Sequence, residues 1–96
     1  MKYADFIRAD VRLVILRILS ELPMYRANSS VLRMALDNYG HNWSRDQVKT
    51  ELAWLQEQSL ITTELMDPVL VATLTERGQD VATGRAIVPG IARPRA

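Results

Sequence analysis

Four polar side chains suited to contacting a nucleic acid lie close together in the sequence: Arg45, Gln47, Lys49 and Thr50. An arginine can bind guanine and a glutamine can bind adenine through paired hydrogen bonds, while a lysine can neutralise a phosphate. DNA-binding helices make such contacts from their first turns. The sequence therefore indicates a DNA-contacting surface. The alternative is that these residues only solvate a helix and that Gln47 is used to cap it.

The distribution of charge opposes a simple DNA-binding surface. The formal net charge is +1, but residues 44–74 contain two basic and five acidic residues, which gives −3. Because phosphate contacts depend on lysine and arginine, other basic residues would have to assist. Arg26 and Arg33 are the candidates earlier in the chain, unless they only solvate it. Arg93 and Arg95 are the candidates near its end.

Residues suited to catalysis or to metal binding are few. The chain has no cysteine and one histidine, His41, which is predicted in a turn without clustered carboxylates beside it. A lone histidine in a turn is far more often a hydrogen-bonding or surface residue than a base or a metal ligand. We therefore expect neither an enzyme nor a metal or cofactor site.

The element expected to carry the contact residues is a helix within residues 44–59. Ser44 and Gln47 have the S-x-x-Q spacing of a capping box. A stripe for the core follows at i, i+4, i+7 and i+11: Val48, Leu52, Leu55 and Ser59. Trp54 lies off this stripe. It either covers the edge of the core beside the wing, the β-hairpin expected after Leu60, or anchors a partner.

A longer helical pattern comes first in the chain, with apolar residues at helical spacing from Asp10 to Leu22. The helix either begins at Asp10 or runs from about residue 3. In a continuous helix a second apolar stripe lies opposite the first: Phe6, Ala9, Leu13 and Leu16. The C-terminal tail covers this stripe, or Phe6, Leu13 and Leu16 form a homodimer interface.

A third helix is predicted between these two. Ser29 or Ser30 can cap residues 31–39, and Gly40 suits the left-handed position that closes a helix. The inward-facing residues expected from the pattern are Val31, Met34 or Ala35, and Tyr39. Residues 24–28 are expected to be a connector, and residues 41–43 the turn of a helix–turn–helix.

The chain after Leu60 predicts a β-hairpin, the wing, because ITTELM and VLVATL flank Asp67-Pro68. Thr75 can cap a short helix that Gly84 ends. Residues 85–96 are expected to be an extended basic tail pinned by three residues: Ile87, Val88 and Ile91. The fold class is therefore mainly α (α+β): a winged helix-turn-helix over residues 1–84, in the order α-α-α-β-β-α, followed by that tail.

Several segments resemble known families. The segment RADVRLVILRILSEL resembles the first helix of ArsR-type winged-helix repressors, and LTERGQDVA resembles the junction between wing and last helix in many winged-helix regulators. Three longer segments are similar to small ArsR-like proteins of Mu-like bacteriophages and prophages: YRANSSVLRMALDNYGH, SRDQVKTELAWLQEQSLIT and VATLTERGQDVATGRAIVPG. The resemblance runs from about Asp10 to Arg95 and implies a winged helix. ArsR-type metal sensing uses cysteine or clustered ligands, so the resemblance does not imply it here.

Two functions follow as expectations. The first is a phage-type DNA-binding transcriptional regulator that acts as a homodimer on double-stranded DNA. The second is a protein–protein interaction module that binds a phage or host protein and has little or no affinity for DNA. No signal peptide or membrane span is visible in the sequence, so we expect the protein in the cytoplasm of a bacterial host.

The helical phase of residues 44–59 gives a first testable prediction. Leu52→Ala should lower the free energy of unfolding by roughly 2–5 kcal/mol, because it empties space in the core. Thr50→Ala, on the opposite face, should change it by no more than about 0.5 kcal/mol. Chemical denaturation of both variants measures the difference. If the two unfolded alike, the phase assigned to this helix would be wrong.

Overall fold

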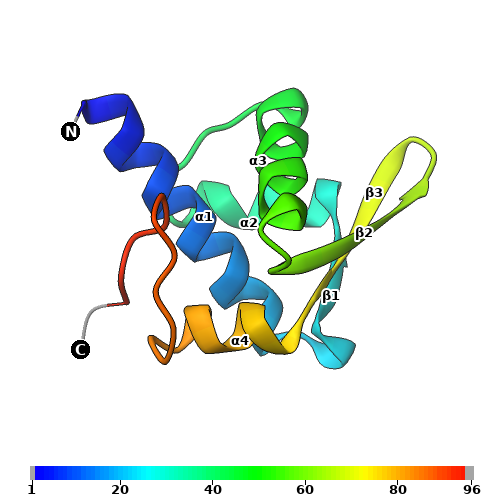
Figure 1. The fold of residues 1–96 in the computed structure, drawn as a ribbon. Coiled ribbons are helices and arrows are strands. Elements are labelled where there is room, and N and C mark those ends of the chain that lie inside the picture. Colours follow the sequence, from blue (N-terminus) through cyan, green and yellow to red (C-terminus); the bar gives the residue numbers. More distant parts are fainter. Residues whose placement is uncertain (1, 95–96) are drawn as a thin grey trace.

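The structure is a computed structural model that describes residues 2–94 (Figure 1). Its helices and strands follow the order α1 (Tyr3–Glu21), η1 (Pro23–Tyr25), β1 (Arg26–Asn28), α2 (Ser29–Asn38), α3 (Arg45–Glu57), β2 (Ile61–Met66), β3 (Val69–Leu74) and α4 (Glu76–Ala82). This arrangement confirms the expected α+β winged helix. Within the described residues, no helix has the length and apolar character needed to cross a bilayer.

The first helix is continuous and lies at the centre of the fold. It is buried on both sides because the other helices cover one side and the tail crosses the other (Figure 1). Val88 and Ile91 of the tail are buried, and the backbone N–H of Ala92 donates to the carbonyl oxygen of Ala9 at 3.1 Å. The tail, over residues 85–94, is therefore part of the folded domain. Ile87, the third residue expected to pin it, is exposed.

This burial corrects the residues predicted for a dimer interface. Leu16 is fully buried and Leu13 is nearly so, both within one copy of the chain. Of the three predicted residues, only Phe6 is well exposed. The physical reason is that α1 has no free apolar side in its central turns, since the tail covers the second stripe.

The second helix also differs from its predicted packing. Asn28 caps it, rather than Ser29 or Ser30, because the Asn28 side chain accepts a hydrogen bond from the Val31 N–H at 2.8 Å. The hydroxyl of Ser29 is buried and accepts a hydrogen bond from the Leu70 N–H at 3.1 Å, which fixes the rotation of α2 against β3. The helix therefore buries Leu32 and Leu36. Of the predicted inward residues, Val31, Met34 and Tyr39 are exposed, whereas Ala35, the alternative to Met34, is partly buried against the core.

The connector predicted before α2 contains a short strand instead. β1 pairs with β3 in an antiparallel register that places Arg26 opposite Thr73 and Asn28 opposite Val71. The sheet order is β1-β3-β2, so the wing hairpin acquires a third strand at its base. Three residues are too few for a strand pattern to be recognised in the sequence.

The helix α3 forms as expected. The Ser44 hydroxyl accepts from the Gln47 N–H at 3.1 Å, and the Gln47 side chain accepts from the Ser44 N–H at 2.9 Å, which completes the capping box. Val48, Leu52 and Leu55 are fully buried. Ser59 lies beyond the end of the helix, exposed and with a positive φ of 64°, so it is not part of the core stripe.

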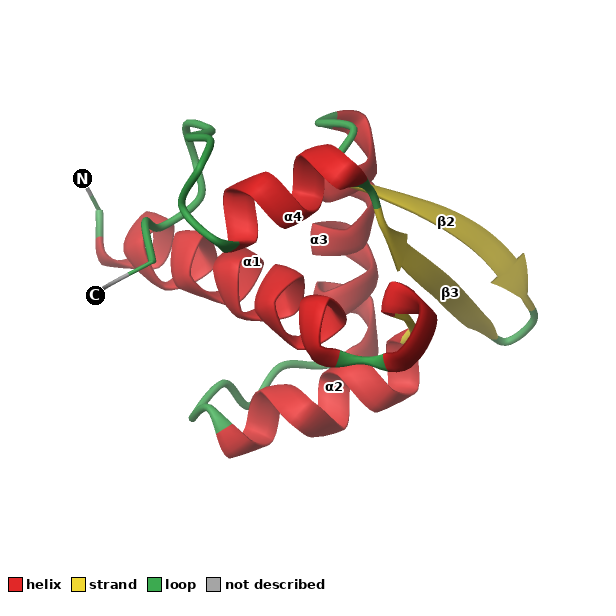
Figure 2. Ribbon diagram, turned by 90° about the horizontal axis from the view of Figure 1, so that it is seen from below, coloured by secondary structure: helices red, strands yellow, loops and turns green. Residues whose placement is uncertain are grey.

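The wing projects from the body of the domain. β2 and β3 extend beyond the helices on the side away from the tail (Figures 1 and 2). At the base of the hairpin Ile61, Ala72 and Leu74 are buried in the core. Toward the turn the side chains leave the core, so Leu65 is 66% exposed and Met66 is 54% exposed.

The last helix packs unusually close to the start of the wing. Thr75 caps α4 by accepting from the Gly78 N–H at 3.0 Å. A Cβ on Gly78 would lie 2.1 Å from the carbonyl oxygen of Leu60 and 2.6 Å from Cδ1 of Leu74. Only glycine fits at this contact, because the nearest obstacle is backbone.

This contact predicts that Gly78→Ala destabilises the protein. Alanine at a tolerant position inside a helix would stabilise by about 0.5–1 kcal/mol relative to glycine. Here the added methyl group overlaps the Leu60 carbonyl, so the free energy of unfolding should fall by about 1–3 kcal/mol or more. Thermal or chemical unfolding of the variant is the measurement. A Gly78→Ala variant as stable as the parent would contradict the close packing of α4 on Leu60.

Candidate nucleic-acid interface

The first turns of α3 form an accessible polar surface. Arg45, Gln47 and Thr50 are exposed and Lys49 is partly exposed, so the structure brings the four predicted residues of this helix together. Arg45 forms no ion pair within the described residues. Its guanidinium is therefore available to a guanine or a phosphate.

The other three side chains of this surface already have partners. Gln47 Oε1 accepts the capping hydrogen bond, so the paired bond to adenine would have to share that oxygen. The Thr50 hydroxyl donates to the Asp46 carbonyl at 2.9 Å. Lys49 Nζ donates to the carbonyl oxygen of Pro68 at 3.0 Å, which ties the turn of the wing to the start of α3. Lys49 therefore has a structural role that the sequence did not indicate.

The arginines predicted to assist DNA binding differ in their position and in their exposure. Arg26 is exposed, but its strand position opposite Thr73 places it at the base of the sheet, far along the hairpin from the turn. Arg33 lies on α2, partly buried, with its Nε atom enclosed and without a hydrogen-bond partner within residues 2–94. Arg93 is exposed on the tail, and Arg95 lies outside the described residues.

The wing is acidic, whereas a wing that contacts the DNA backbone needs basic residues. Residues 61–74 contain Glu64 and Asp67 and no lysine or arginine. The ammonium group of Lys49 is the positive charge at the turn, where it is bound to Pro68. The accessible side chains near the turn are otherwise apolar, Leu65 and Met66. Phosphates would be repelled by this hairpin rather than attracted.

An ion-pair network centred on the buried carboxylate of Glu51 lies behind α3, on the side facing α1. Glu51 has only 4% of its side chain exposed and accepts a hydrogen bond from Arg12 Nε at 2.6 Å. Arg8 Nε lies 3.4 Å from its second carboxylate oxygen. Both arginines come from α1, so these contacts fix how α3 sits on α1. Arginine is suited to this role because its planar group pairs with carboxylates in fixed geometry.

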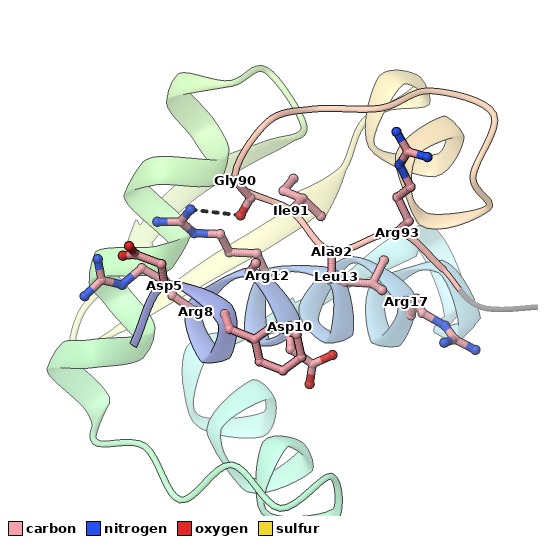
Figure 3. A pocket seen from close by; sticks show the side chains of 12 residues that line it. Asp5, Arg8, Asp10, Arg12, Leu13, Arg17, Gly90, Ile91, Ala92 and Arg93 are labelled. Carbon is pink, nitrogen blue, oxygen red and sulfur yellow. Dashed lines mark hydrogen bonds between the residues drawn. The ribbon is translucent and has the colours of Figure 1, made fainter. Parts of the chain in front are cut away.

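Arg12 also connects the tail to the same network. Its Nη1 donates to the Gly90 carbonyl oxygen at 3.0 Å (Figure 3), and its guanidinium carbon lies 3.7 Å from the centroid of the Trp54 ring. Gly90 has a φ of +95°, and a Cβ there would lie 3.0 Å from Arg12 Nη1 and 3.1 Å from the Trp54 ring. Trp54 is therefore at the edge of the core, but beside the tail and not beside the wing as predicted.

The sequence did not reveal this network. One signal was present: Glu51 and Trp54 lie together on the flank of the core stripe of α3. Arg8 and Arg12 are four residues apart and therefore share a face of α1. Their partners are 39 or more residues away in the chain, so only the folded arrangement identifies them.

His41 has a structural partner. Its Nε2 lies 2.7 Å from Asp10 Oδ2, and its ring is buried between the helix–turn–helix turn and α1. Within residues 2–94 no group of three histidine, cysteine, aspartate or glutamate side chains is placed to hold a metal ion.

Comparison with solved structures supports the class of fold. The chain is similar to AbsC, a MarR family transcriptional regulator from Streptomyces coelicolor, with a TM-score of 0.62 and 24% identity over 74% of this chain. It is also similar to hsRosR-S1, with a TM-score of 0.64 and 20% identity over 74% of this chain. This chain covers 47% and 62% of those longer chains. The fold is the winged helix, similar to that of MarR-family regulators.

The sequence relatives define the family. The chain is 53% identical over 91 residues to the uncharacterized protein gp26 of Escherichia phage Mu, covering 95% of this chain and 94% of the relative. It is 50% identical over 78 residues to an uncharacterized protein of Haemophilus influenzae, covering 80% of this chain and 76% of that one. The chain belongs to the family of Mu gp26, which confirms the resemblance to Mu-like phage proteins. No protein-family model matches it. The ArsR-like subtype stays a prediction.

The buried network predicts that Arg12→Ala is strongly destabilising. Removing Arg12 leaves the Glu51 carboxylate buried with Arg8 as its remaining partner at 3.4 Å. Loss of one member of a buried ion pair costs about 3–5 kcal/mol, and the remaining contact with Arg8 should keep the loss near the lower end of that range. Arg17→Ala, on the exposed side of the same helix, should change stability by no more than about 0.5 kcal/mol. Denaturation measures both.

A second measurement separates this network from general destabilisation. The amide of Ala92 donates a hydrogen bond to Ala9. In Arg12→Ala its hydrogen exchange should accelerate, relative to the parent protein, more than that of the α3 amides, because the tail loses its hydrogen bond at Gly90. If the Arg12 and Arg17 variants were equally stable, the network would contribute nothing to the free energy of unfolding.

Proposed function

We propose that this protein is a phage-type DNA-binding transcriptional regulator that places the start of α3 in the major groove. The observation that supports this most directly is the accessible surface of Arg45, Gln47, Lys49 and Thr50 on a capped helix within a winged helix-turn-helix. Arg45 would read guanine, and the amide NH₂ of Gln47 would donate to a neighbouring base. The protein would act in the cytoplasm of its bacterial host.

The binding mode must differ from one in which the wing grips phosphates. Glu64 and Asp67 on the hairpin repel the backbone, so phosphate contacts fall to Arg45 and Lys49 at the start of α3. Few phosphate contacts imply weak non-specific binding, with a dissociation constant of about 10⁻⁴ to 10⁻⁶ M or poorer near physiological salt. Tight binding would then require a specific sequence.

A second candidate function is a protein–protein interaction module on the same scaffold. Its support is the wing, where Leu65 and Met66 are exposed between two acidic residues. An exposed apolar group beside acidic residues suits a protein partner better than it suits DNA. The two functions predict opposite results in one experiment.

The experiment is a selection of DNA fragments from a Mu-like phage genome and its host, followed by sequencing of the retained fragments. The regulator should enrich one motif, and Arg45→Ala should weaken binding to that motif by about 1–3 kcal/mol. The affinity should fall with a shallow dependence on salt, about 0.9 log units per log unit of salt for each phosphate contact.

Arg77→Ala is the matched control, because it removes an exposed arginine from α4 and leaves α3 unchanged. It should bind the enriched motif as the parent does. Retention of no fragment at about 50 mM salt, where electrostatic attraction is strengthened, would reject the regulator in favour of the interaction module.

A further inference from the structure

A groove lies between α1 and the tail, on the side of the domain away from the wing (Figure 3). Its volume is about 730 Å³, within the range of about 300–1,000 Å³ typical of clefts that enclose a ligand. Its apolar lining comes mainly from the half-exposed Phe6 of α1, with small exposed parts of Leu13 and of Ile91 in the tail. The groove therefore offers space for apolar side chains from outside the domain.

The rim of this α1–tail groove is basic. Four arginines line it, Arg8, Arg12, Arg17 and Arg93, against two aspartates, Asp5 and Asp10. Arg8 and Arg12 are paired with Glu51, and Asp10 is paired with His41, so within residues 2–94 the rim charges outside ion pairs are Asp5, Arg17 and Arg93. Within residues 2–94 neither Arg17 nor Arg93 forms an ion pair, and Figure 3 shows both at the end of the groove remote from α3. These two charges are available to an acidic partner.

The wing tip, residues 64–67, has the complementary character. Leu65 and Met66 are exposed and are flanked by Glu64 and Asp67. Lys49 reaches the carbonyl oxygen of Pro68 in the neighbouring turn. Because side chains alternate along a strand, Leu65 and Met66 point to opposite faces of the hairpin, so an apolar surface wraps around its end. An exposed apolar end on a projecting hairpin is accessible to a partner.

We propose that the wing tip of one copy of this protein docks in the α1–tail groove of a second copy. Leu65 and Met66 enter the apolar lining, and Glu64 and Asp67 face Arg17 and Arg93. Charge complementarity identifies the occupant, since the groove is basic with an apolar lining and the wing tip is acidic with an apolar end. The argument for this assembly does not require that α3 binds DNA.

The position of the two surfaces determines the kind of assembly. The groove is lined by α1 and the tail, and the wing projects from the opposite end of the domain in both ribbon views, so a chain cannot fill its own groove (Figures 1 and 2). Each copy then uses its wing on one neighbour and its groove on another. Such head-to-tail contacts form a ring when the rotation closes and an open filament when it does not. The small contact area implies a dissociation constant between about 1 μM and 1 mM.

Sedimentation over a range of concentrations tests the assembly without DNA. The weight-average mass of the parent should rise above the monomer mass of 10.9 kDa as the concentration approaches about 1 mM. A wing variant (Leu65→Ser, Met66→Ser) and a groove variant (Arg17→Glu, Arg93→Glu) should each remain monomeric. Arg17 and Arg93 are exposed polar residues, and Leu65 and Met66 lie on the exposed end of the hairpin, so both variants should fold.

Mixing the two variants gives the decisive result. The groove variant keeps an intact wing, and the wing variant keeps an intact groove, so an equimolar mixture should form a heterodimer. The assembly should stop there, at twice the monomer mass, because no further intact pair remains. A symmetric dimer interface does not predict this recovery.

Matched controls remove the same chemistry from other surfaces. Met24→Ser with Met34→Ser removes two exposed apolar side chains, and Arg77→Glu with Arg85→Glu reverses two exposed arginines. Both controls should associate as the parent does. A parent that is monomeric at about 1 mM, a wing or groove variant that still associates, or a mixture that remains monomeric would each overturn the proposal.

Discussion

The ion pair between Glu51 and Arg12 is the constraint on which the arrangement of the domain depends. A carboxylate with 4% of its side chain exposed is stable only if it is paired and hydrogen-bonded. Arg12 supplies that pairing from α1, and the same guanidinium stacks on Trp54 and holds the Gly90 carbonyl of the tail. One side chain therefore links α3, α1 and the tail, and α3 carries the surface proposed to read DNA.

The domain has the winged-helix fold but not the charge of a DNA-gripping wing. Capping, core stripes and the hairpin define the backbone, and none of these requires basic residues on the wing. Surface charge can therefore change without loss of the fold, as it does at Glu64 and Asp67. Fold and function are separable for this reason, and the proposed DNA contact rests on α3 rather than on the fold alone.

The sequence predicted the elements with strong local signals. The Ser44–Gln47 capping box, the stripe of Val48, Leu52 and Leu55, and the hairpin around Asp67-Pro68 all form. The rotation of α2 was predicted wrongly because this helix has apolar residues on two faces. A hydrogen bond from the distant Leu70 N–H to Ser29 favours burial of the face with Leu32 and Leu36. The core positions of Leu13 and Leu16 depended on whether the tail or a second copy covers α1, and local periodicity does not decide that. The pairing of Glu51 with two arginines of α1 is likewise a property of the tertiary structure.

Arg12 belongs to two surfaces at once, since it lines the α1–tail groove and holds the carboxylate behind α3. Any occupant of the groove that alters the position of this guanidinium also alters the setting of α3 on α1. Thermodynamic linkage makes such an effect reciprocal. If an occupant of the groove changes the affinity of α3 for its ligand by some factor, that ligand changes the affinity of the groove for its occupant by the same factor. A single shared arginine is thus a direct physical route by which the two proposed binding events, on different faces of this small domain, would be coupled.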